Sequence, residues 1–299
     1  MRRRGTGPIS PPMTRFKLGY RRIAGAVLAT LAAACSPLRT FDALVPKDGG
    51  VRQVVRGAAF GPHPRQRVDV YAPKRPGAPL PVIVFLYGGS WNSGTRGGYG
   101  FVGRALASRG FVVAVPDYRL VPEVRYPAFL QDNAAAVRWV RANAASFGGD
   151  PDRLVIAGRS AGAYNAAMLA MDLRWLGKDG QAVKGWIGLA GPYDFAIDSP
   201  VTRDAFGHVA DPAGTQPITH AAAGDPPALL LTGDSDTLVL PRNSDALAAR
   251  LHRAGVSAER RRYPVGHVGL LTAIARPLRG RAPVLADMTA FATRVTELK

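Results

Sequence analysis

The sequence is poor in cysteine, because Cys35 is the single one among 299 residues. No disulfide can therefore form within one chain, and the folded part must be stable without such a bond. Acidic residues are also scarce, 21 against 39 lysines and arginines, which gives a formal net charge of +18. No long basic run and no nucleic-acid-binding motif accompanies this excess. A solvated basic surface explains the charge most simply, although it would also attract anionic surfaces such as polysaccharide or lipid head groups.

The first 35 residues have the composition of an export signal. They hold seven basic residues and no acidic one, and Arg21-Arg22 precede an apolar run from Ile23 to Ala34. A run of about 12 residues is too short to span a bilayer as a stable anchor. A basic flank, an apolar core and a small-residue end are typical of a secretory signal, so we predict that residues 1–35 direct export. Met1 and Met13 are both possible translation starts.

Cys35 directly follows Ala32-Ala33-Ala34. Small residues before a cysteine resemble the lipoprotein box of bacteria, in which the cysteine is lipidated and becomes the new N-terminus. The resemblance implies a lipid anchor to the membrane through Cys35, and a location in the cell envelope or periplasm. Ala32 stands where this box usually has leucine. The alternative is that Cys35 merely lies near an ordinary cleavage site.

The rest of the chain alternates short apolar runs with segments of helical period. Continuous apolar runs predict fully buried strands at 82–86, 111–115, 154–157, 186–189 and 229–231. The alternating segment Val68-Asp69-Val70-Tyr71 predicts a half-exposed strand. Helices are expected at 101–106, 129–144 and 161–173, near Asn243, and after Pro283.

Apolar strands that alternate with helices predict an α/β fold, with a mostly parallel sheet covered by helices on both faces. Residues 36–299 show no repeat and no break in composition, so we expect them to form a single catalytic domain. The segment 194–226 is rich in Pro, Gly, Asp and Ala and has no clear period. We expect it to form a minimal lid over the C-terminal edge of the sheet.

Ser160 lies in Gly158-Arg159-Ser160-Ala161-Gly162, a Gly-x-Ser-x-Gly pattern that is weak evidence by itself. Its setting strengthens it, because the pattern directly follows an apolar run and directly precedes a predicted helix, as in a nucleophile elbow. A tight turn brings neighbouring backbones close, which explains the two glycines. The helix that begins at Ala161 would point backbone N–H groups at a developing oxyanion. We therefore predict that Ser160 is a nucleophile.

A second glycine-rich segment, Tyr87-Gly88-Gly89-Ser90-Trp91, immediately follows the run at 82–86. It resembles the His-Gly-Gly-x stretch, often followed by Trp, of lipases and esterases of the hormone-sensitive-lipase and formamidase type. That resemblance implies oxyanion donors at the N–H groups of Gly89 and Ser90, joined by that of Ala161. Tyr87 replaces the family's histidine, which usually shapes the loop rather than reacting. The alternative is an ordinary glycine-rich turn between strand and helix.

The acid and the base of a triad should follow Ser160 in that order. Residues 233–239, Gly-Asp-Ser-Asp-Thr-Leu-Val, resemble the family's Gly-x-x-Asp-x-x-Val, which implies Asp236 as the acid. Asp234 is the alternative, and otherwise a loop-capping residue. His267 follows Val265-Gly266 in a short loop after a strand-like segment, and we predict that it is the base. The other histidines fit the order or the loop position less well: His63, His208, His220 and His252.

A fourth similarity lies at 117–123, Asp-Tyr-Arg-Leu-Val-Pro-Glu, which resembles a stretch that follows the third core strand of the same family. We interpret it as structural, tying the loop beneath the oxyanion elbow. The four motifs together make residues 50–298 similar to α/β-hydrolase-fold esterases, in the group of hormone-sensitive-lipase-like and BD-FAE-like carboxylesterases and kynurenine formamidases. The resemblance implies a Ser-His-Asp hydrolase of carboxylic esters that forms an acyl-enzyme and needs no metal or other cofactor.

The substrate is less well defined. The absence of a large inserted cap favours an open site, a small-molecule ester and short acyl chains, and aromatic residues are candidates to line the site: Trp91, Tyr164, Tyr193 and Phe195. The same scaffold hosts arylformamidases and peptidases, which are the alternative activities. A non-catalytic envelope lipoprotein that binds a ligand is an alternative of another class.

Overall fold

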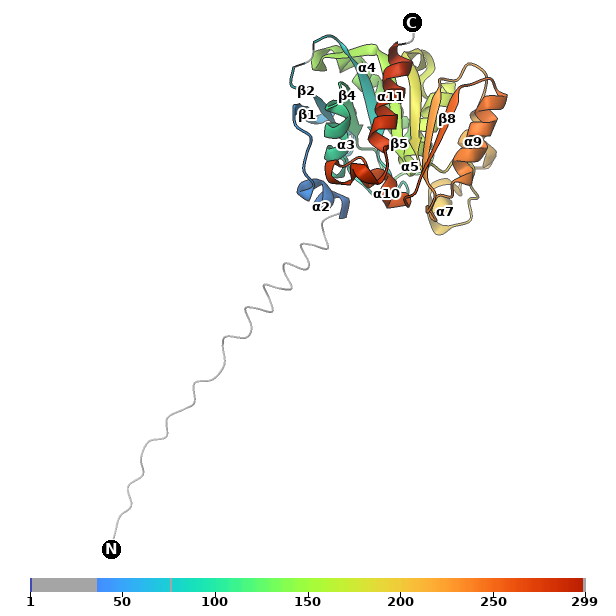
Figure 1. Ribbon diagram of the computed structural model, residues 1–299. Helices are drawn as coiled ribbons and strands as arrows, with labels where there is room; N and C mark the ends of the chain where they lie inside the picture. Colours follow the sequence, from blue (N-terminus) through green and yellow to red (C-terminus); the bar gives the residue numbers. More distant parts are fainter. Residues whose placement is uncertain (2–36, 76, 298–299) are drawn as a thin grey trace. The chain divides into compact units, whose positions relative to one another are not determined.

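A single eight-stranded sheet organises the part of the chain that the structure describes (Figure 1). The computed structural model describes Met1 and residues 37–75 and 77–297, so the predicted export signal and Cys35 lie outside the described residues. In space the strands follow the order β1-β2-β4-β3-β5-β6-β7-β8. Their bounds are β1 Val51–Ala59, β2 Arg67–Pro73, β3 Leu80–Leu86, β4 Val112–Pro116, β5 Gly149–Arg159, β6 Val183–Leu189, β7 Ala228–Gly233 and β8 Ala258–Tyr263.

The strands from β4 to β8 run parallel, whereas β1 and β2 are antiparallel to their neighbours. The five predicted apolar runs coincide with strands, except that Phe111 precedes β4 by one residue, and β4 and β7 are buried along their whole length. A parallel sheet is buried on both faces, which is why these strands are continuously apolar. The structure therefore confirms the predicted mostly parallel sheet.

Two details of the predicted strands were wrong. β1 has no counterpart among them, because Arg52 and Arg56 interrupt its apolar residues on the exposed side of an edge strand. β2 was expected to be half-exposed, but its five central residues are buried, including Asp69. The Asp69 carboxylate accepts hydrogen bonds from the Gly57 N–H at 2.7 Å and from Arg96 Nε at 3.0 Å. A buried charge is tolerated when it is paired in this way.

Helices cover both faces of the sheet (Figure 1). One face packs against α3, α10 and α11, and the other against α4, α5 and α9. Alternate residues of each strand supply the two cores, since Ile83 and Phe85 face one side while Val82 and Val84 face the other. The helices are α2 Pro37–Leu44, α3 Gly100–Ala107, α4 Ala128–Asn143, α5 Ala161–Met171, α6 Leu173–Leu176, α7 Pro200–Phe206, α8 Pro217–His220, α9 Arg242–Arg253, α10 His267–Thr272 and α11 Val284–Glu297.

The segment predicted to form a small lid contains only short helices, α7, α8 and one 3₁₀ turn at Ala213–Thr215. Ser199 begins α7 with a capping box, in which its hydroxyl accepts from the Thr202 N–H at 3.2 Å. Phe206 at the end of α7 is buried in the core cluster that α3 and α11 share. Among the described residues, no helix is long and apolar enough to cross a bilayer.

The turn between β5 and α5 brings three backbone segments unusually close. A Cβ atom on Gly162 would lie 2.0 Å from the carbonyl oxygen of Leu86, and one on Gly158 would lie 2.1 Å from the carbonyl oxygen of Gly162. Neither position can hold a side chain without moving the backbone. The end of β3 and the start of α5 therefore pack in direct backbone contact.

We expect Gly162→Ala to destabilise the protein by about 2–3 kcal/mol, because the added methyl group must displace the backbone of β3. The measurement is the free energy of unfolding in urea. Gly280→Ala is the matched control, since a Cβ atom there meets nothing within 4 Å, and it should leave the stability almost unchanged. Equal stabilities of the two variants would contradict the close approach.

Candidate active site

Ser160, His267 and Asp236 lie in one hydrogen-bonded chain. His267 Nε2 is 3.1 Å from Ser160 Oγ, and its Nδ1 is 2.7 Å from Asp236 Oδ2. The exposed fractions of the three residues are 7%, 9% and 2% for Ser160, His267 and Asp236. The other carboxylate oxygen, Asp236 Oδ1, accepts from the N–H groups of Leu238 at 3.0 Å and Val239 at 2.9 Å. The acid is thus held by the backbone of its own loop while it orients the imidazole.

The sheet explains why residues so far apart in sequence meet. Ser160, Asp236 and His267 follow the ends of β5, β7 and β8, and these strands run parallel. Carboxyl ends of parallel strands share one edge of a sheet, which is where the crevice of an open α/β fold lies. Ser160 itself has a φ of +54°, the strained turn of an elbow that raises its side chain above this edge.

The alternative residues lie elsewhere. Asp234 is exposed and accepts from Arg262 Nε at 2.6 Å, so it does not contact His267. The other four histidines bond to backbone carbonyls or to a carboxylate away from Ser160: His63 to Glu123, His208 to Tyr126, His220 to Gly214 and His252 to Ala258.

The charge state of His267 favours a base. Burial lowers the pKa of His267 from its ordinary value, and the nearby Arg159 guanidinium lowers it further, while Asp236 acts in the opposite direction. The net shift is downward, so the imidazole is neutral at neutral pH. With Nδ1–H donated to Asp236, Nε2 is free to accept the proton of the Ser160 hydroxyl.

The loop after β3 folds back beside the nucleophile. Gly89, Ser90 and Trp91 all have positive φ angles of 136°, 51° and 58°. The Gly89 carbonyl accepts from the N–H groups of Asn92 at 3.0 Å and Ser93 at 2.9 Å, which closes the turn. A Cβ atom on Gly88 would lie 2.9 Å from Ser160 Cβ, so this loop packs directly on the elbow.

Three backbone donors are available at this junction. Within the described residues, no hydrogen bond uses the N–H of Gly89 or Ser90, which lie in this loop, or the N–H of Ala161, which begins α5. Free N–H groups beside a nucleophile suit a developing negative charge. These are the three residues that the sequence predicted as oxyanion donors.

Comparisons with known proteins agree with this architecture. Residues 68–195 match the BD-FAE family model. Esterase B from Lactobacillus rhamnosis has a similar structure, with a TM-score of 0.77 and 20% identity over 92% of this chain and 97% of the other. The protein has an α/β-hydrolase fold and carries a BD-FAE segment. The segment contains Ser160 and the loop 87–91, whereas Asp236 and His267 lie beyond it.

Two curated relatives are named as esterases. A probable isoprenylcysteine alpha-carbonyl methylesterase of rice, Oryza sativa subsp. japonica, is 34% identical over 150 residues, which cover 48% of this chain and 36% of the relative. The carboxylesterase NlhH of Mycobacterium tuberculosis is 46% identical over 112 residues, 37% of this chain and 35% of the relative. The chain thus matches about a third of the length of these curated relatives.

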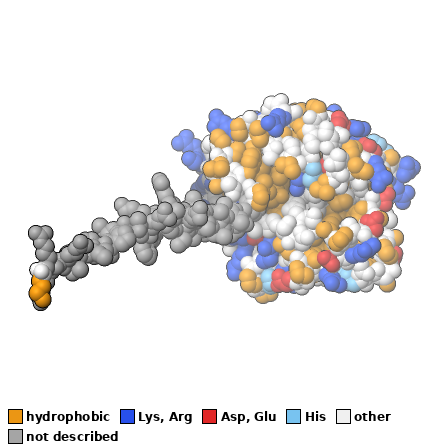
Figure 2. Space-filling view, turned by 90° about the horizontal axis from the view of Figure 1, so that it is seen from below, with side chains coloured by type: hydrophobic (Ala, Val, Ile, Leu, Met, Phe, Trp, Pro, Cys, Tyr) orange, Lys and Arg blue, Asp and Glu red, His pale blue; other side chains and the backbone are white. Residues whose placement is uncertain are grey.

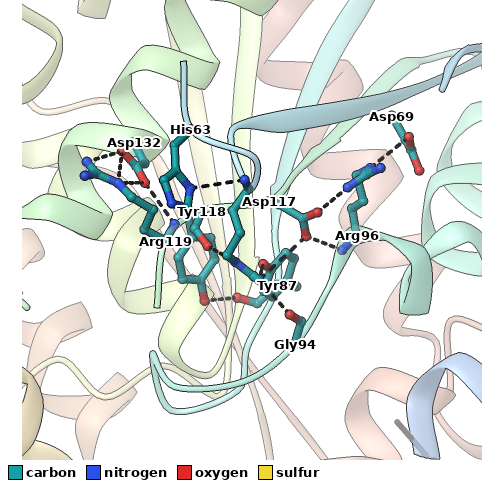
Figure 3. Close-up of polar contacts among 10 residues, drawn as sticks. His63, Asp69, Tyr87, Gly94, Arg96, Asp117, Tyr118, Arg119 and Asp132 are labelled. Carbon is teal, nitrogen blue, oxygen red and sulfur yellow. Dashed lines mark hydrogen bonds and ion pairs between the residues drawn. The ribbon is translucent and has the colours of Figure 1, made fainter. Parts of the chain in front are cut away.

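Tyr87, where the resemblance led us to expect a histidine, lies in an aromatic stack. Its buried ring packs between Tyr118, at 4.7 Å between ring centroids, and Tyr99, at 5.5 Å. Its hydroxyl accepts from Arg65 Nη2 at 2.9 Å (Figure 3). Burial raises the pKa of Tyr87 well above its ordinary value, so the phenol stays neutral. Tyr87 therefore holds the loop by packing and one hydrogen bond.

Charged side chains fasten the same loop of the BD-FAE segment at its far end (Figure 3). Asp117 accepts from the Arg96 N–H at 2.6 Å and also from the Arg96 guanidinium, which in turn bonds Asp69. Arg65 donates to the Gly94 carbonyl at 2.9 Å and to the Tyr118 carbonyl at 2.8 Å. The stretch 117–123 therefore ties the loop, as its sequence predicted. Arg65, Asp69 and Arg96 were missed because their contacts join distant parts of the chain.

Three predicted lining residues need correction. Tyr164 and Tyr193 are fully buried, so they do not line an open site. The Tyr164 hydroxyl donates to the Thr215 carbonyl at 2.7 Å. The Tyr193 ring packs against that of Trp186, with 6.0 Å between the ring centroids. Trp91 is also buried, and its Nε1–H donates to Asn165 Oδ1 at 3.1 Å.

Exposed apolar side chains lie near the catalytic residues in sequence instead. Leu238 and Val268, which follow the acid and the base, have exposed fractions of 71% and 63%. Figure 2 looks at the side where α7 and α10 lie, and it shows hydrophobic side chains gathered toward the middle of this face. Phe195 is partly exposed as well. In the described part of the chain, no group of three or more His, Cys, Asp or Glu residues could hold a metal ion.

We expect Arg96→Met to destabilise the protein by about 2–4 kcal/mol, because it leaves the buried carboxylates of Asp69 and Asp117 without their shared cation. Unfolding in urea measures the change. Arg261→Met removes an exposed ion pair with Glu259 and should cost about 0.5 kcal/mol or less. If the two substitutions cost the same, the network does not hold the loop as described.

Proposed function

We propose that the protein is a carboxylic ester hydrolase that works through Ser160, His267 and Asp236. The observation that carries the proposal is the chain of hydrogen bonds from Ser160 through a neutral His267 to a buried Asp236. Free N–H groups beside the nucleophile support it. So do the names of the relatives, which are a methylesterase and a carboxylesterase.

The reaction follows from the positions of these groups. His267 Nε2 takes the hydroxyl proton as Ser160 Oγ attacks the ester carbonyl, and Asp236 stabilises the imidazolium that forms. The oxyanion of the tetrahedral intermediate binds the N–H groups of Gly89, Ser90 and Ala161, each worth about 3 kcal/mol of barrier. His267 then protonates the leaving alkoxide, which departs as an alcohol and leaves an acyl-enzyme. Water, activated by the same imidazole, attacks the acyl-enzyme and releases the carboxylic acid.

The proposal predicts that a fluorophosphonate probe labels the protein at Ser160, and that Ser160→Ala is neither labelled nor active. With p-nitrophenyl acetate as substrate, kcat should fall by a factor of about 10⁴ or more. Ser146→Ala, which alters an exposed serine at the far end of the sheet, should keep both labelling and activity. A Ser160→Ala protein that hydrolyses the ester at the wild-type rate would end the proposal, and absence of labelling in the wild type would favour a binding protein.

We further propose that the enzyme prefers short acyl chains. Aromatic rings fill the space beside the loop that supplies the oxyanion donors. The centroid of the Trp91 ring lies 4.9 Å from that of Phe206, 5.2 Å from that of Tyr164 and 6.0 Å from that of Phe195. These rings are buried apart from Phe195, which forms the outer edge of the cluster. A filled pocket accepts a small acyl group more readily than a long one, because a long chain would have to displace packed side chains.

A panel of p-nitrophenyl esters tests this preference. We expect kcat/KM to be highest for acetyl and butyryl esters and to fall by about tenfold or more for decanoyl esters. Phe195→Ala should raise the decanoyl rate relative to the butyryl rate. Phe147→Ala is the matched control, because Phe147 is also partly exposed but packs against Trp139 on the other core. An unchanged ratio in Phe195→Ala would show that this cluster does not set chain length. Aryl formamides in the same panel test the alternative activity.

A further inference from the structure

Arg159, the last residue of β5, is half-buried and places its guanidinium next to the base. Its Nη2 donates to the backbone carbonyl of His267 at 3.2 Å. Its Nε is also buried and has no hydrogen-bond partner among the described residues. No ion pair of the described part of the chain involves Arg159, although its charge lies near Asp236. Among the described residues this half-buried cation gains nothing from an ion pair, and its buried Nε lacks a partner, so its position beside the nucleophile points to function rather than to stability.

The same guanidinium also reaches the loop of the oxyanion donors. Burial raises the pKa of the Tyr99 hydroxyl, and the Arg159 charge acts on the same hydroxyl and lowers that pKa by less. Tyr99 is buried and stacks on Tyr87 at 5.5 Å. A Cβ atom on Gly88 would lie 3.2 Å from Arg159 Cδ, so the stem of the side chain packs against the loop as well.

Three parts of the site therefore meet at one side chain. Arg159 is joined by the backbone to Ser160 and through its Nη2 to the first residue of α10, and the stem of its side chain packs against Gly88. α10 has only six residues and begins at His267, so little of its own length fixes the base. The hydrogen bond from Arg159 reaches the backbone carbonyl of His267 itself. It therefore acts directly on the position of the imidazole, where a small displacement would reduce the rate most.

We propose that Arg159 is a positioning residue, which fixes His267 relative to Ser160 and to the loop that binds the oxyanion. This inference rests on the proposed hydrolase function and deepens it. Arg159 occupies the variable position of the Gly-x-Ser-x-Gly pattern, so the nucleophile elbow also supplies the group that aligns its base.

The charge of Arg159 has a second effect that makes the role measurable. The charged groups that act on His267 are Arg159 from β5 and Asp236 from the loop after β7, and Asp234 on that loop is paired with Arg262 at the surface. Burial of His267 and the Arg159 charge both lower its pKa, so removing the charge raises that pKa. The acid limb of kcat/KM reports the pKa of the base in the free enzyme, and it should move to higher pH.

Two substitutions separate the hydrogen bonds from the charge. We expect Arg159→Gln to lower kcat by about 10- to 100-fold with little change in KM, because a misplaced base harms the transition state alone. Its acid limb should rise by about 0.5–1 pH unit. Arg159→Lys keeps the charge but not the planar, many-donor geometry, so kcat should fall while the acid limb stays near that of the wild type.

The matched control is Arg153→Gln, in the first half of the same strand, where the side chain bonds Asp150 and the Pro79 carbonyl. It should leave the pH profile unchanged. NMR titration of the His267 imidazole in Ser160→Ala, with and without Arg159→Gln, measures the pKa shift without any turnover. An unchanged imidazole pKa and acid limb, with a kcat loss that matches the loss of folded protein, would overturn the proposal. Wild-type protein that fails to react with a fluorophosphonate would instead contradict the hydrolase function, and the NMR titration would still test Arg159.

Discussion

The close approach of the β5–α5 turn to the end of β3 is the constraint on which the rest of the site depends. Gly162 lies against the carbonyl of Leu86, and Gly88 lies against Ser160. Because these backbones touch, the free N–H groups of the loop after β3 and of α5 are brought to the same side of the nucleophile. Side chains at either glycine would push the two apart, and the donors would no longer converge.

Much of this core could be predicted from the sequence, for physical reasons. A strand that is buried on both faces must be apolar throughout, so β3, β4, β5 and β7 are visible as continuous runs. A turn that permits no Cβ atom must use glycine, which makes the elbow at Gly158 and Gly162 recognisable once a strand precedes it. Asp236 and His267 follow later strands of the same parallel sheet, so the carboxyl ends of these strands place both residues on the same edge as Ser160.

The remaining features depend on contacts between distant residues, which leave no local pattern. Asp69 alternates with valines as a solvent-facing residue would, yet it is buried against Arg96 from another segment. Tyr164 and Tyr193 follow the motifs closely enough to suggest contact with substrate, but the faces that carry them turn into the core. A single sequence shows that such residues are polar or aromatic, and only the packing shows which neighbour satisfies them.

The electrostatics around His267 indicate what Arg159 contributes. A positive charge that lowers the pKa of the base gains little at neutral pH, because the imidazole is already neutral there. The same charge opposes the imidazolium that forms in the transition state, and Asp236 must offset this cost. The electrostatic effect of Arg159 on the base is therefore unfavourable or neutral for catalysis. What remains in its favour is geometry, since its guanidinium holds the carbonyl of His267 and its stem packs against Gly88. A cation that weakens the base electrostatically can persist when the alignment that it enforces lowers the barrier by more than its charge raises it.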